Sequence, residues 1–266
     1  MLHYYPSAVP LTNRSGHNSH STGRFFAMCG RYAASADEGT LREMFELEQV
    51  LELPPASWNV APTDHVPTVV ERADKGTGVV TRRLIAPRWG LVPSWSKGPG
   101  GPPMINARVE TIETKPAFRT ALAKRRCLLP ADGYYEWYET GQLTAKGKPV
   151  KQPFFIRPES GLLVMAGLYE FWRDPAVEGL EAWLTSVTII TTQATDKLGH
   201  IHDRMPMIIP PDAWADWLDP ALEDPQAAHD LLTVTQPEDL EAYAVSTQVN
   251  TVANNTHELV EPLAES

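Results

Sequence analysis

The stretch "LLVMAGLYEFW" (residues 162–172) is long, apolar and rich in aromatic and β-branched side chains, which is typical of a buried β-strand. A second stretch of this kind, "WLTSVTIITT", follows at residues 183–192. Three shorter runs precede them, namely "CLLPA" (127–131), "YYEWY" (134–138) and "PFFIR" (153–157). Because helices do not alternate regularly with these runs, the sequence predicts an α+β fold rather than a doubly wound sheet.

Helices are expected on either side of this strand-rich centre. Residues 37–51 predict a helix capped by Asp37, with Leu41, Met44, Phe45 and Leu51 on its apolar face. A second helix is expected within residues 109–126, from about Lys115, with Pro116 in its first turn. Short helices are expected at 210–218 and 224–232, and a last strand at 240–246.

The chain divides into three parts by composition. Residues 1–27 are rich in Ser, His, Asn and Gly without hydrophobic periodicity, so we expect a disordered extension. This extension lacks the basic and apolar regions of a signal peptide. Residues 28–250 form the expected domain, and residues 251–266 are expected to be a loose tail. No apolar run approaches the roughly 18 residues of a membrane span, so no membrane partner is expected.

The charge is distributed unevenly over the 266 residues, which carry a formal net charge of −10. Residues 1–130 hold 16 Lys and Arg against 11 Asp and Glu, whereas residues 131–266 hold 7 against 22. Basic clusters lie at Arg82, Arg83 and Arg88 and at 124–126. Such clusters form either a solvated face or a local patch for phosphates, and the acidic total does not exclude the second reading.

Tryptophans stand among prolines and glycines in "PRWGLVPSW" (87–95), just before "KGPGGPP" (97–103). The Gly and Pro run predicts a turn or loop. Trp89 and Trp95 suit either the core or a surface on which bases stack. Taken alone, these residues favour the core for both.

Cys29 directly follows Met28, and only one other cysteine, Cys127, is present. No Cys-x-x-Cys spacing exists, so neither a zinc site nor a disulfide framework is expected. If translation starts at Met28 and the methionine is removed, Cys29 carries an α-amine beside its thiol. The reference pKa values of about 8 and 8.5 leave both groups partly deprotonated near neutral pH. Such a 1,2-aminothiol condenses with an aldehyde to an imine and then to a thiazolidine. Taken alone, the Met-Cys pair favours a small buried hydrophobe for Cys29.

Further polar residues stand in unusual surroundings. Asn106, Arg108 and Glu110 alternate in "MINARVET" and would share one side of an extended segment. Glu136 lies among aromatic residues, which favour a raised carboxyl pKa and general acid–base work, although a salt-bridged surface carboxylate is the alternative. The pair His200 and His202 suggests a metal, but no further ligand cluster accompanies it, so no metal is expected.

Eight segments together resemble the SRAP (SOS response-associated peptidase) family of abasic-site processing proteins. They occur in the family's order from Met28 to about Pro210: "MCGRYA", "NVAPT", "RWGLVPSW", "INARVET", "RRCLLPADGYYEWY", "AGLYEFW", "TIITTQA" and "HDRMPMII". The resemblance implies a single compact α+β domain with a β-barrel-like, mixed or antiparallel core and peripheral helices.

The resemblance also implies a chemistry and the residues that perform it. Its members join themselves covalently to abasic sites in single-stranded DNA, as part of the response to DNA damage, through a thiazolidine with an N-terminal cysteine. Carried over to this chain, Cys29 supplies amine and thiol, Asn106 positions the sugar, Glu136 moves protons, and His202 assists opening of the sugar ring. Contacts with phosphates and bases fall on Arg31, Arg108, Arg204, Trp95 and Pro62. No metal and no cofactor are implied.

Two other functions stay open at the level of sequence. Cys29, Glu136 and His202 could serve a cysteine peptidase or N-terminal-nucleophile hydrolase, in trans or only on the chain itself, and lyase-type strand cleavage could accompany crosslinking. Arg and Trp residues alone could form a noncovalent single-stranded DNA-binding module. Three explanations remain for the segment before Cys29: Met28 is the true start, the chain removes the segment itself, or the protein is inactive. We expect Met28 to be the true start. We expect a cytoplasmic monomer that acts at damaged DNA.

Overall fold

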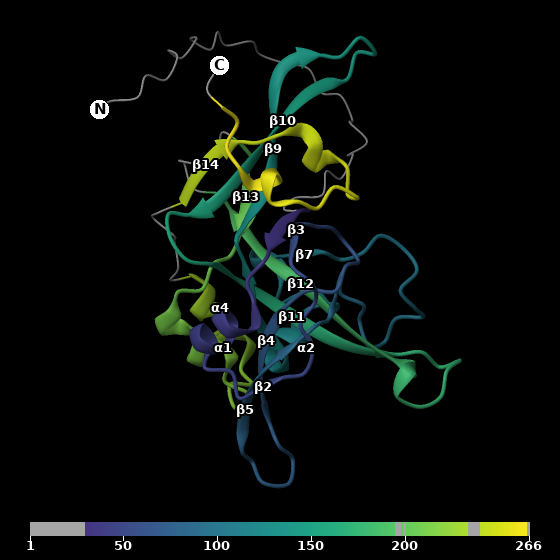
Figure 1. The fold of residues 1–266 in the computed structure, drawn as a ribbon. Helices are drawn as coiled ribbons and strands as arrows, with labels where there is room; N and C mark the ends of the chain where they lie inside the picture. Colours follow the sequence, from purple (N-terminus) through teal and green to yellow (C-terminus); the bar gives the residue numbers. More distant parts are fainter. Residues whose placement is uncertain (1–29, 195–197, 199–200, 234–239, 265–266) are drawn as a thin grey trace.

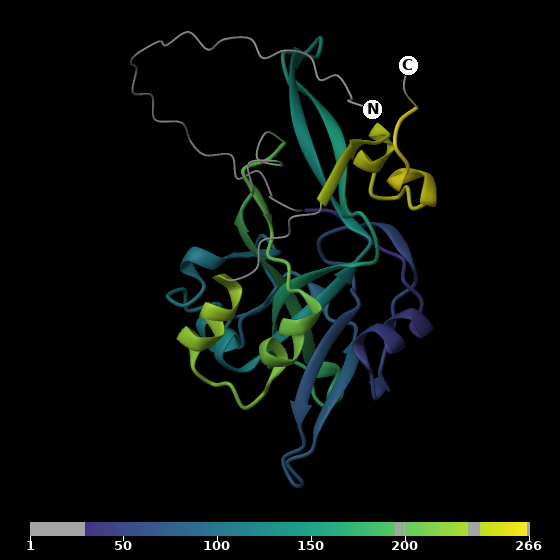
Figure 2. The same ribbon diagram turned by 90° about the vertical axis from the view of Figure 1, so that its left-hand side faces the viewer.

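The computed structural model describes residues 30–194, 198, 201–233 and 240–264. Cys29 and the expected extension, residues 1–27, lie outside the described residues. The described chain forms two β-sheets and a small number of helices, which confirms the α+β class. Figures 1 and 2 show the α-helices gathered around the lower part of the molecule, while β9 and β10 rise above it as a two-stranded arm.

The smaller sheet has five strands in the order β14-β10-β9-β1-β3, and the larger has nine. The five strands are β1 (Tyr32–Ala34), β3 (Ser57–Val60), β9 (Gly133–Leu143), β10 (Pro149–Pro158) and β14 (Leu240–Ala244). The nine are β2 (Gln49–Val50), β4 (Thr68–Ala73), β5 (Val80–Ile85), β6 (Arg88–Trp89), β7 (Asn106–Arg108), β8 (Arg126–Ala131), β11 (Leu163–Arg173), β12 (Trp183–Gln193) and β13 (Arg204–Pro206). Within the described ranges neither sheet closes on itself, so two facing sheets replace the expected barrel-like core.

Side chains that alternate along the strands separate three hydrophobic layers. One face of the nine-stranded sheet packs against the helices α1 (Glu38–Phe45), α2 (Arg119–Lys124), α3 (Trp214–Leu218) and α4 (Pro225–Thr233). Its other face packs against the five-stranded sheet, with Tyr32, Trp89, Cys127 and Tyr134 in that layer. The third layer lies between the far face of the five-stranded sheet and the C-terminal segment.

The chain passes from one sheet to the other within "LLPADGYYEWY". β8 ends at Ala131, Asp132 accepts a hydrogen bond of 2.7 Å from the Ser35 amide, and β9 begins at Gly133. A Cβ atom on Gly133 would lie 2.5 Å from the carbonyl oxygen of Ile156 and 2.6 Å from the ring of Phe155. Only glycine therefore allows β10 to approach this closely, and the strand that follows carries Glu136.

The strand predictions agree with the structure, but the first helix is shorter than the sequence predicted. Asp37 caps α1 as expected, accepting a hydrogen bond of 2.8 Å from the Thr40 amide. The helix ends at Phe45 because Glu46 adopts a left-handed conformation, with φ of 52°. The chain then forms β2, which pairs in parallel with β5, and Leu51 is 62% exposed instead of lying on an apolar helix face.

Two other expectations differ from the structure. The region 109–126 contains a 3-10 helix, η1 (Val109–Thr111), and the short α2, so the helix begins later than Lys115. In the expected loose tail, Leu259 lies in the 3-10 helix η5 (His257–Val260) and is only 1% exposed. The remaining 3-10 helices are η2 (Leu180–Ala182), η3 (Pro211–Ala213) and η4 (Thr247–Asn250). No helix in the described part of the chain is long and apolar enough to cross a membrane.

The basic cluster at 124–126 is structural rather than a phosphate patch. Arg126 is 4% exposed and donates hydrogen bonds to the backbone carbonyls of Leu122, Ala123, Trp217 and Asp219. These acceptors lie at the ends of α2 and α3, where carbonyls lack helical partners. Arg125 forms an ion pair of 2.7 Å with Glu170. The cluster at 124–126 is therefore explained by contacts with helix ends and by ion pairs within the protein.

Candidate functional site

Strand β12 brings together segments that are far apart in the sequence. β7 pairs with it in parallel, with Asn106 opposite Ile189 and Arg108 opposite Thr191. β13 pairs with it in antiparallel fashion, with Pro206 opposite Thr191 and Arg204 opposite Gln193. The C-terminal end of β12 therefore places "NAR" beside "HDRMP", as the expected site requires.

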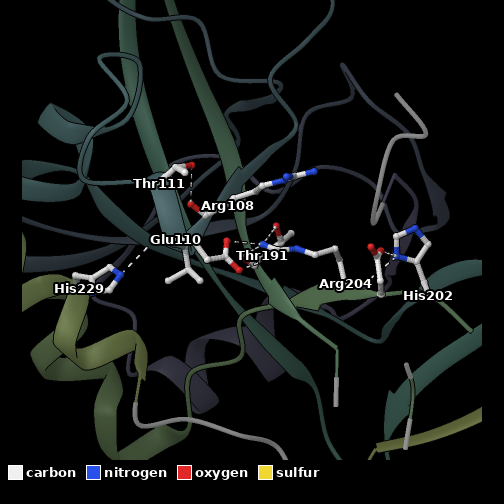
Figure 3. A network of polar contacts seen from close by, with 9 residues as sticks. Arg108, Glu110, Thr111, Thr191, His202, Arg204 and His229 are labelled. Atoms are coloured by element: carbon white, nitrogen blue, oxygen red, sulfur yellow. Dashed lines mark hydrogen bonds and ion pairs between the residues drawn. The ribbon is translucent and has the colours of Figure 1, made fainter. Parts of the chain in front are cut away.

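An ion pair between the buried Arg204 and the partly exposed Glu110 lies at this junction (Figure 3). The guanidinium of Arg204 donates two hydrogen bonds to the carboxylate of Glu110, that of Nη2 to Oε2 measuring 3.0 Å. Nη2 also donates to the carbonyl of Thr191 at 2.7 Å. Arg204 is only 8% exposed. Its positive charge is thus neutralised within the protein, so a phosphate could reach it only if the pair with Glu110 opened.

Glu110 lies in η1, not in an extended strand, so the expected alternation of Asn106, Arg108 and Glu110 ends at Arg108. Partial burial favours the neutral acid, but the hydrogen bonds and charge of Arg204 outweigh that effect and lower the pKa of Glu110. The carboxylate is therefore ionised at neutral pH. Arg108 itself is exposed, and its side chain extends away from the pair in Figure 3.

His202 stands two residues before Arg204 and is half-buried. Its Nδ1 accepts a hydrogen bond of 3.1 Å from the Arg204 amide and lies 3.1 Å from a carboxylate oxygen of Asp203. Burial lowers the pKa of His202, the charge of Asp203 opposes this, and the charges of Lys151 and Arg204 add to the lowering. The hydrogen bond from the Arg204 amide requires an unprotonated Nδ1 and places the proton of the neutral ring on Nε2, whereas the nearby carboxylate of Asp203 favours a proton on Nδ1. His200 lies outside the described residues.

Glu136 projects from β9 and is 3% exposed. Tyr134, on the same face of the strand, packs in the layer between the two sheets, so alternation directs Glu136 to that side as well. Its strand neighbour Tyr135 donates its amide to the carbonyl of Arg31 at 3.0 Å. Glu136 is thus a buried carboxyl rather than a surface one, beside the segment that follows Cys29.

Lys151 links the two sheets electrostatically. It lies on β10, opposite Glu139 in the register, and forms an ion pair of 3.1 Å with that residue. Its charge still lowers the pKa of His202, which precedes β13 of the other sheet. This proximity could not be predicted from the sequence, because Lys151 belongs to none of the eight resembling segments. Thr191, by contrast, lies within "TIITTQA" and was recognisable as part of a motif.

Arg31 also makes internal contacts. Its Nη1 donates to Oδ1 of Asn59 at 2.6 Å and to the carbonyl of Val249 at 2.9 Å. Burial lowers the pKa of its guanidinium, which nevertheless stays charged at neutral pH. Asn59, 2% exposed, donates further hydrogen bonds to Thr251 and Asn254. Arg31, which directly precedes β1, therefore connects this strand to β3 and to the C-terminal segment by hydrogen bonds. The Arg31 side chain is partly exposed to solvent.

The two tryptophans of "RWGLVPSW" have different environments. Trp89 is fully buried and donates from its indole to the carbonyl of Ile105 at 3.0 Å. Trp95 is 68% exposed, so the core assignment made from these residues alone is wrong for it. Trp172 anchors the loop that follows, donating to the carbonyl of Ser96 at 2.8 Å. The exposed ring of Trp95 is available for stacking.

Pro62 lies in a strained turn at the end of β3. The next residue, Thr63, has φ of 83°, which is rare for a β-branched side chain. The turn is held by the carboxylate of Asp64, which accepts from the Ala61 amide at 2.9 Å, and by the Thr63 amide, which donates to Trp89 at 2.9 Å. Such strain is often retained at functional sites, and here it fixes the half-buried Pro62 ring.

Within the described ranges, no group of three or more His, Cys, Asp or Glu side chains could hold a metal ion. The structure thus pairs both Asn106 and Arg108 of β7 and Arg204 of β13 with β12, with His202 just before β13, and places Glu136 on the inner face of the facing sheet. Cys29 lies outside the described residues.

Comparison with known proteins identifies relatives over most of the chain. It is 39% identical over 239 residues to the abasic site processing protein YoqW of Bacillus subtilis, covering 88% of this chain and 99% of that protein. It is 35% identical over 245 residues to the abasic site processing protein HMCES of Pongo abelii, covering 78% of this chain and 65% of that protein.

Solved structures have the same fold. A Bacteroides thetaiotaomicron protein superimposes with a TM-score of 0.71 at 23% identity, covering 88% of this chain and all of that one. A Bordetella bronchiseptica protein superimposes with a TM-score of 0.64 at 27% identity, covering 82% of this chain and all of that one. The sequence profile of the SOS response associated peptidase (SRAP) family matches residues 28–252. The chain therefore belongs to the SRAP family.

Proposed function

We propose that this protein processes abasic sites in single-stranded DNA by forming a covalent thiazolidine crosslink through Cys29. The observation that carries the proposal is the position of Glu136. This buried carboxyl lies in the strand segment that pairs with Arg31, and only Gly30 separates Arg31 from Cys29. Because consecutive Cα atoms are about 3.8 Å apart, a two-residue span brings the Cys29 Cα within about 8 Å of that of Arg31.

The chemistry needs a free α-amine. The ring-opened abasic sugar presents an aldehyde, and the amine of Cys29 adds to its carbon to give a carbinolamine. Loss of water then gives an imine. The thiolate of Cys29 adds to the imine carbon, the nitrogen takes up a proton, and the five-membered thiazolidine is complete. The family profile begins at residue 28, which supports a working chain that starts with Cys29.

Each step requires a proton to move, and the site contains two suitable groups. Glu136 would donate the proton that lets the carbinolamine oxygen leave as water, and would accept one from the thiol before ring closure. His202, neutral and with its Nε2 proton available, would hold the sugar oxygen during ring opening. Asn106 would position the sugar by hydrogen bonding.

Roles in DNA binding divide according to exposure. Arg108 and Trp95 are exposed, so we assign phosphate contact to Arg108 and base stacking to Trp95, with Pro62 against a neighbouring base. The guanidiniums of Arg31 and Arg204 already donate to protein acceptors. Arg204 is accordingly a positioning residue, which holds Glu110 and the end of β12 in place beneath Arg108.

The experiment is covalent capture of a single-stranded oligonucleotide with one abasic site. A chain that begins at Cys29 should give an adduct that survives heat and denaturant, whereas Cys29→Ala should give none. Glu136→Gln should slow capture by about 10²-fold or more, the usual contribution of a general acid–base. Glu159→Gln, an exposed carboxyl just after β10, is the matched control and should react normally. An adduct formed equally well by Cys29→Ala would refute the proposal.

Because the family's description includes the word peptidase, we propose one additional activity to test, removal of the residues before Cys29 by the chain itself. Incubation of the full 266-residue chain, followed by intact mass measurement, tests this directly. Self-processing predicts a product that starts at Cys29 and fails to form in Glu136→Gln. Turnover of an added peptide, lost in Cys29→Ala, would instead indicate a peptidase that acts in trans.

A further inference from the structure

A cavity of about 300 Å³ lies at one end of the nine-stranded sheet, apart from the residues of the proposed crosslinking site. β11 pairs with β8 only over Leu163–Leu168, whereas its last five residues, from Tyr169 to Arg173, pair with β12 alone. β8 begins at Arg126, so the sheet has a notch beyond that residue, between β4 and β11. The cavity lies over this notch.

Alternating side chains of β4, β5 and β11, together with Thr185 of β12, line the cavity from one face of the sheet. The alternating side chains are Val70 and Arg72 of β4, Arg83 and Ile85 of β5, and Tyr169 and Phe171 of β11. Val70 and Tyr169 also belong to the layer between the two sheets, so the cavity opens at the edge of that layer. Its walls are therefore apolar and aromatic, with two guanidinium groups among them.

Among the described residues neither of these arginines forms an ion pair, although the charge of Arg83 acts on the exposed carboxylate of Asp74. The guanidinium of Arg72 lies over the ring of Phe171, 5.1 Å from its centre. Nε of Arg83 is buried without a hydrogen-bond partner. Their neighbour Arg82, directed to the other face of β5, forms an ion pair of 2.7 Å with Glu71. Nε of Arg125 and of Arg204 are also buried without a partner, but Arg83 differs from them in lining an open cavity and in having no ion pair.

The only carboxylate among the lining residues is Glu52, which is exposed at the rim. The cavity thus carries two fixed positive charges against one negative charge that forms no ion pair with them. Forked guanidinium donors suit phosphate oxygens, and aromatic and apolar walls suit a base. The volume is at the lower end of the range for small-ligand pockets.

We propose that this cavity binds one unpaired nucleotide, with its phosphate on Arg72 and Arg83 and its base against the apolar wall. The choice of a nucleotide as the anion rests on the proposed function, in which DNA is the partner. The nucleotide is either a free mononucleotide or a unit of the bound strand. Thr185, which lines the cavity, is four residues along β12 from Ile189, the partner of Asn106. A strand rises about 3.3 Å per residue, so the two positions lie about 13 Å apart.

The test is a titration of the full chain with three ligands: dAMP, inorganic phosphate and an undamaged oligothymidylate. Binding is measured by calorimetry and by methyl NMR. Methyl signals of Val70 and Ile85 should shift with the nucleotide. Arg72→Gln and Arg83→Gln should each weaken binding about tenfold or more, the effect of losing a charged hydrogen bond. Lys75→Gln removes a charge from the exposed turn between β4 and β5 and should have no effect. Glu52→Gln should tighten binding.

The outcomes separate the two sources of nucleotide. Binding of dAMP that depends on both arginines supports a free nucleotide, and binding of the oligonucleotide alone with the same dependence supports a unit of the strand. Inorganic phosphate that binds as tightly as dAMP, or methyl signals that stay in place, would overturn the proposal. Capture of abasic DNA by Arg83→Gln is measured separately and reports on the crosslinking function. Failure of the nucleotide-binding proposal can therefore be distinguished from failure of the crosslinking proposal. Unchanged signals from the distant α4 verify the fold of each variant.

Discussion

At the scale of single residues, the site depends on the ionisation of groups that are partly removed from water. Arg204 and Glu110 neutralise each other, and His202 stays neutral because burial lowers its pKa. The sequence indicated Arg204 and His202 through the "HDRMP" motif. The sequence could not indicate that Arg204 forms an ion pair, because its partner Glu110 lies 94 positions away in the chain. Only the pairing of β7 and β13 with the same strand brings these two residues together.

Glu110→Gln should destabilise the protein, because the mostly buried Arg204 would lose its counterion. We expect a loss of about 2 kcal/mol in the free energy of unfolding, the usual range for a hydrogen bond to a charged group. Urea denaturation measures this loss. Glu113→Gln, on a nearby carboxyl with no ion pair in the described structure, serves as the control and should change stability by less than about 0.5 kcal/mol. Equal stability of the two variants would contradict the role given to the pair.

His202 makes stability depend on pH in a defined direction. Its pKa in the folded protein lies below the unfolded value, so the unfolded chain takes up the proton first as the pH falls. The contribution of neutral His202 is complete above the unfolded pKa of about 6.5 and is lost as the pH falls from there to the lower folded pKa. His202→Gln should therefore flatten the dependence of the unfolding free energy on pH in that window. A dependence for His202→Gln equal to that of the parent chain would contradict this assignment.

At the scale of elements, strands were predictable and helix ends were not. The composition of the long apolar runs in β11 and β12 predicts strands, whichever strands they pair with. The end of α1 depends on the parallel pairing of β2 with β5, a contact between distant segments that overrides the helical preference of residues 46–51. Likewise, Trp95 differs from Trp89 only through the loop that exposes it.

Gly133→Ala should disrupt the junction between the two sheets. Its Cβ would overlap the backbone of Ile156, and relief requires β9 and β10 to separate. We expect a loss of about 3 kcal/mol in unfolding free energy, at the upper end of overpacking effects. Capture of abasic DNA should slow as well, since Glu136 follows on the same strand. Gly100→Ala, where a Cβ meets nothing within 4 Å, is the control for the change of residue type.

Trp172→Phe should loosen the loop that carries Trp95. The substitution keeps the aromatic packing but removes the hydrogen bond from the indole to Ser96, at a cost of about 1 kcal/mol in stability. Limited proteolysis should then cut within residues 95–103 sooner, and affinity for single-stranded DNA should fall. Trp183→Phe, at a tryptophan that is 52% exposed, should change neither measurement. Unaltered proteolysis of Trp172→Phe would show that the loop is held by other contacts.

At the scale of the whole molecule, two facing sheets would hold the proposed site between them. One sheet contributes Glu136 and the segment that follows Cys29, and the other contributes Asn106, Arg108 and His202. The family resemblance predicted these residues from order of motifs alone. It did not predict the open two-sheet core, the ordered C-terminal segment or the cavity with two arginines, because these depend on long-range packing rather than on local sequence.

The most direct test of the account is the chemical state of the cysteines in the purified DNA adduct. The chain contains two, and Cys127 is buried in the core, so the adduct should be denatured and then treated with a thiol-alkylating reagent. A thiazolidine at Cys29 predicts a mass one water below the sum of protein and DNA, no gain of hydrogen with borohydride, and alkylation of Cys127 alone. Alkylation of both cysteines, or reduction by borohydride, would show a simple imine and would contradict the proposed ring closure.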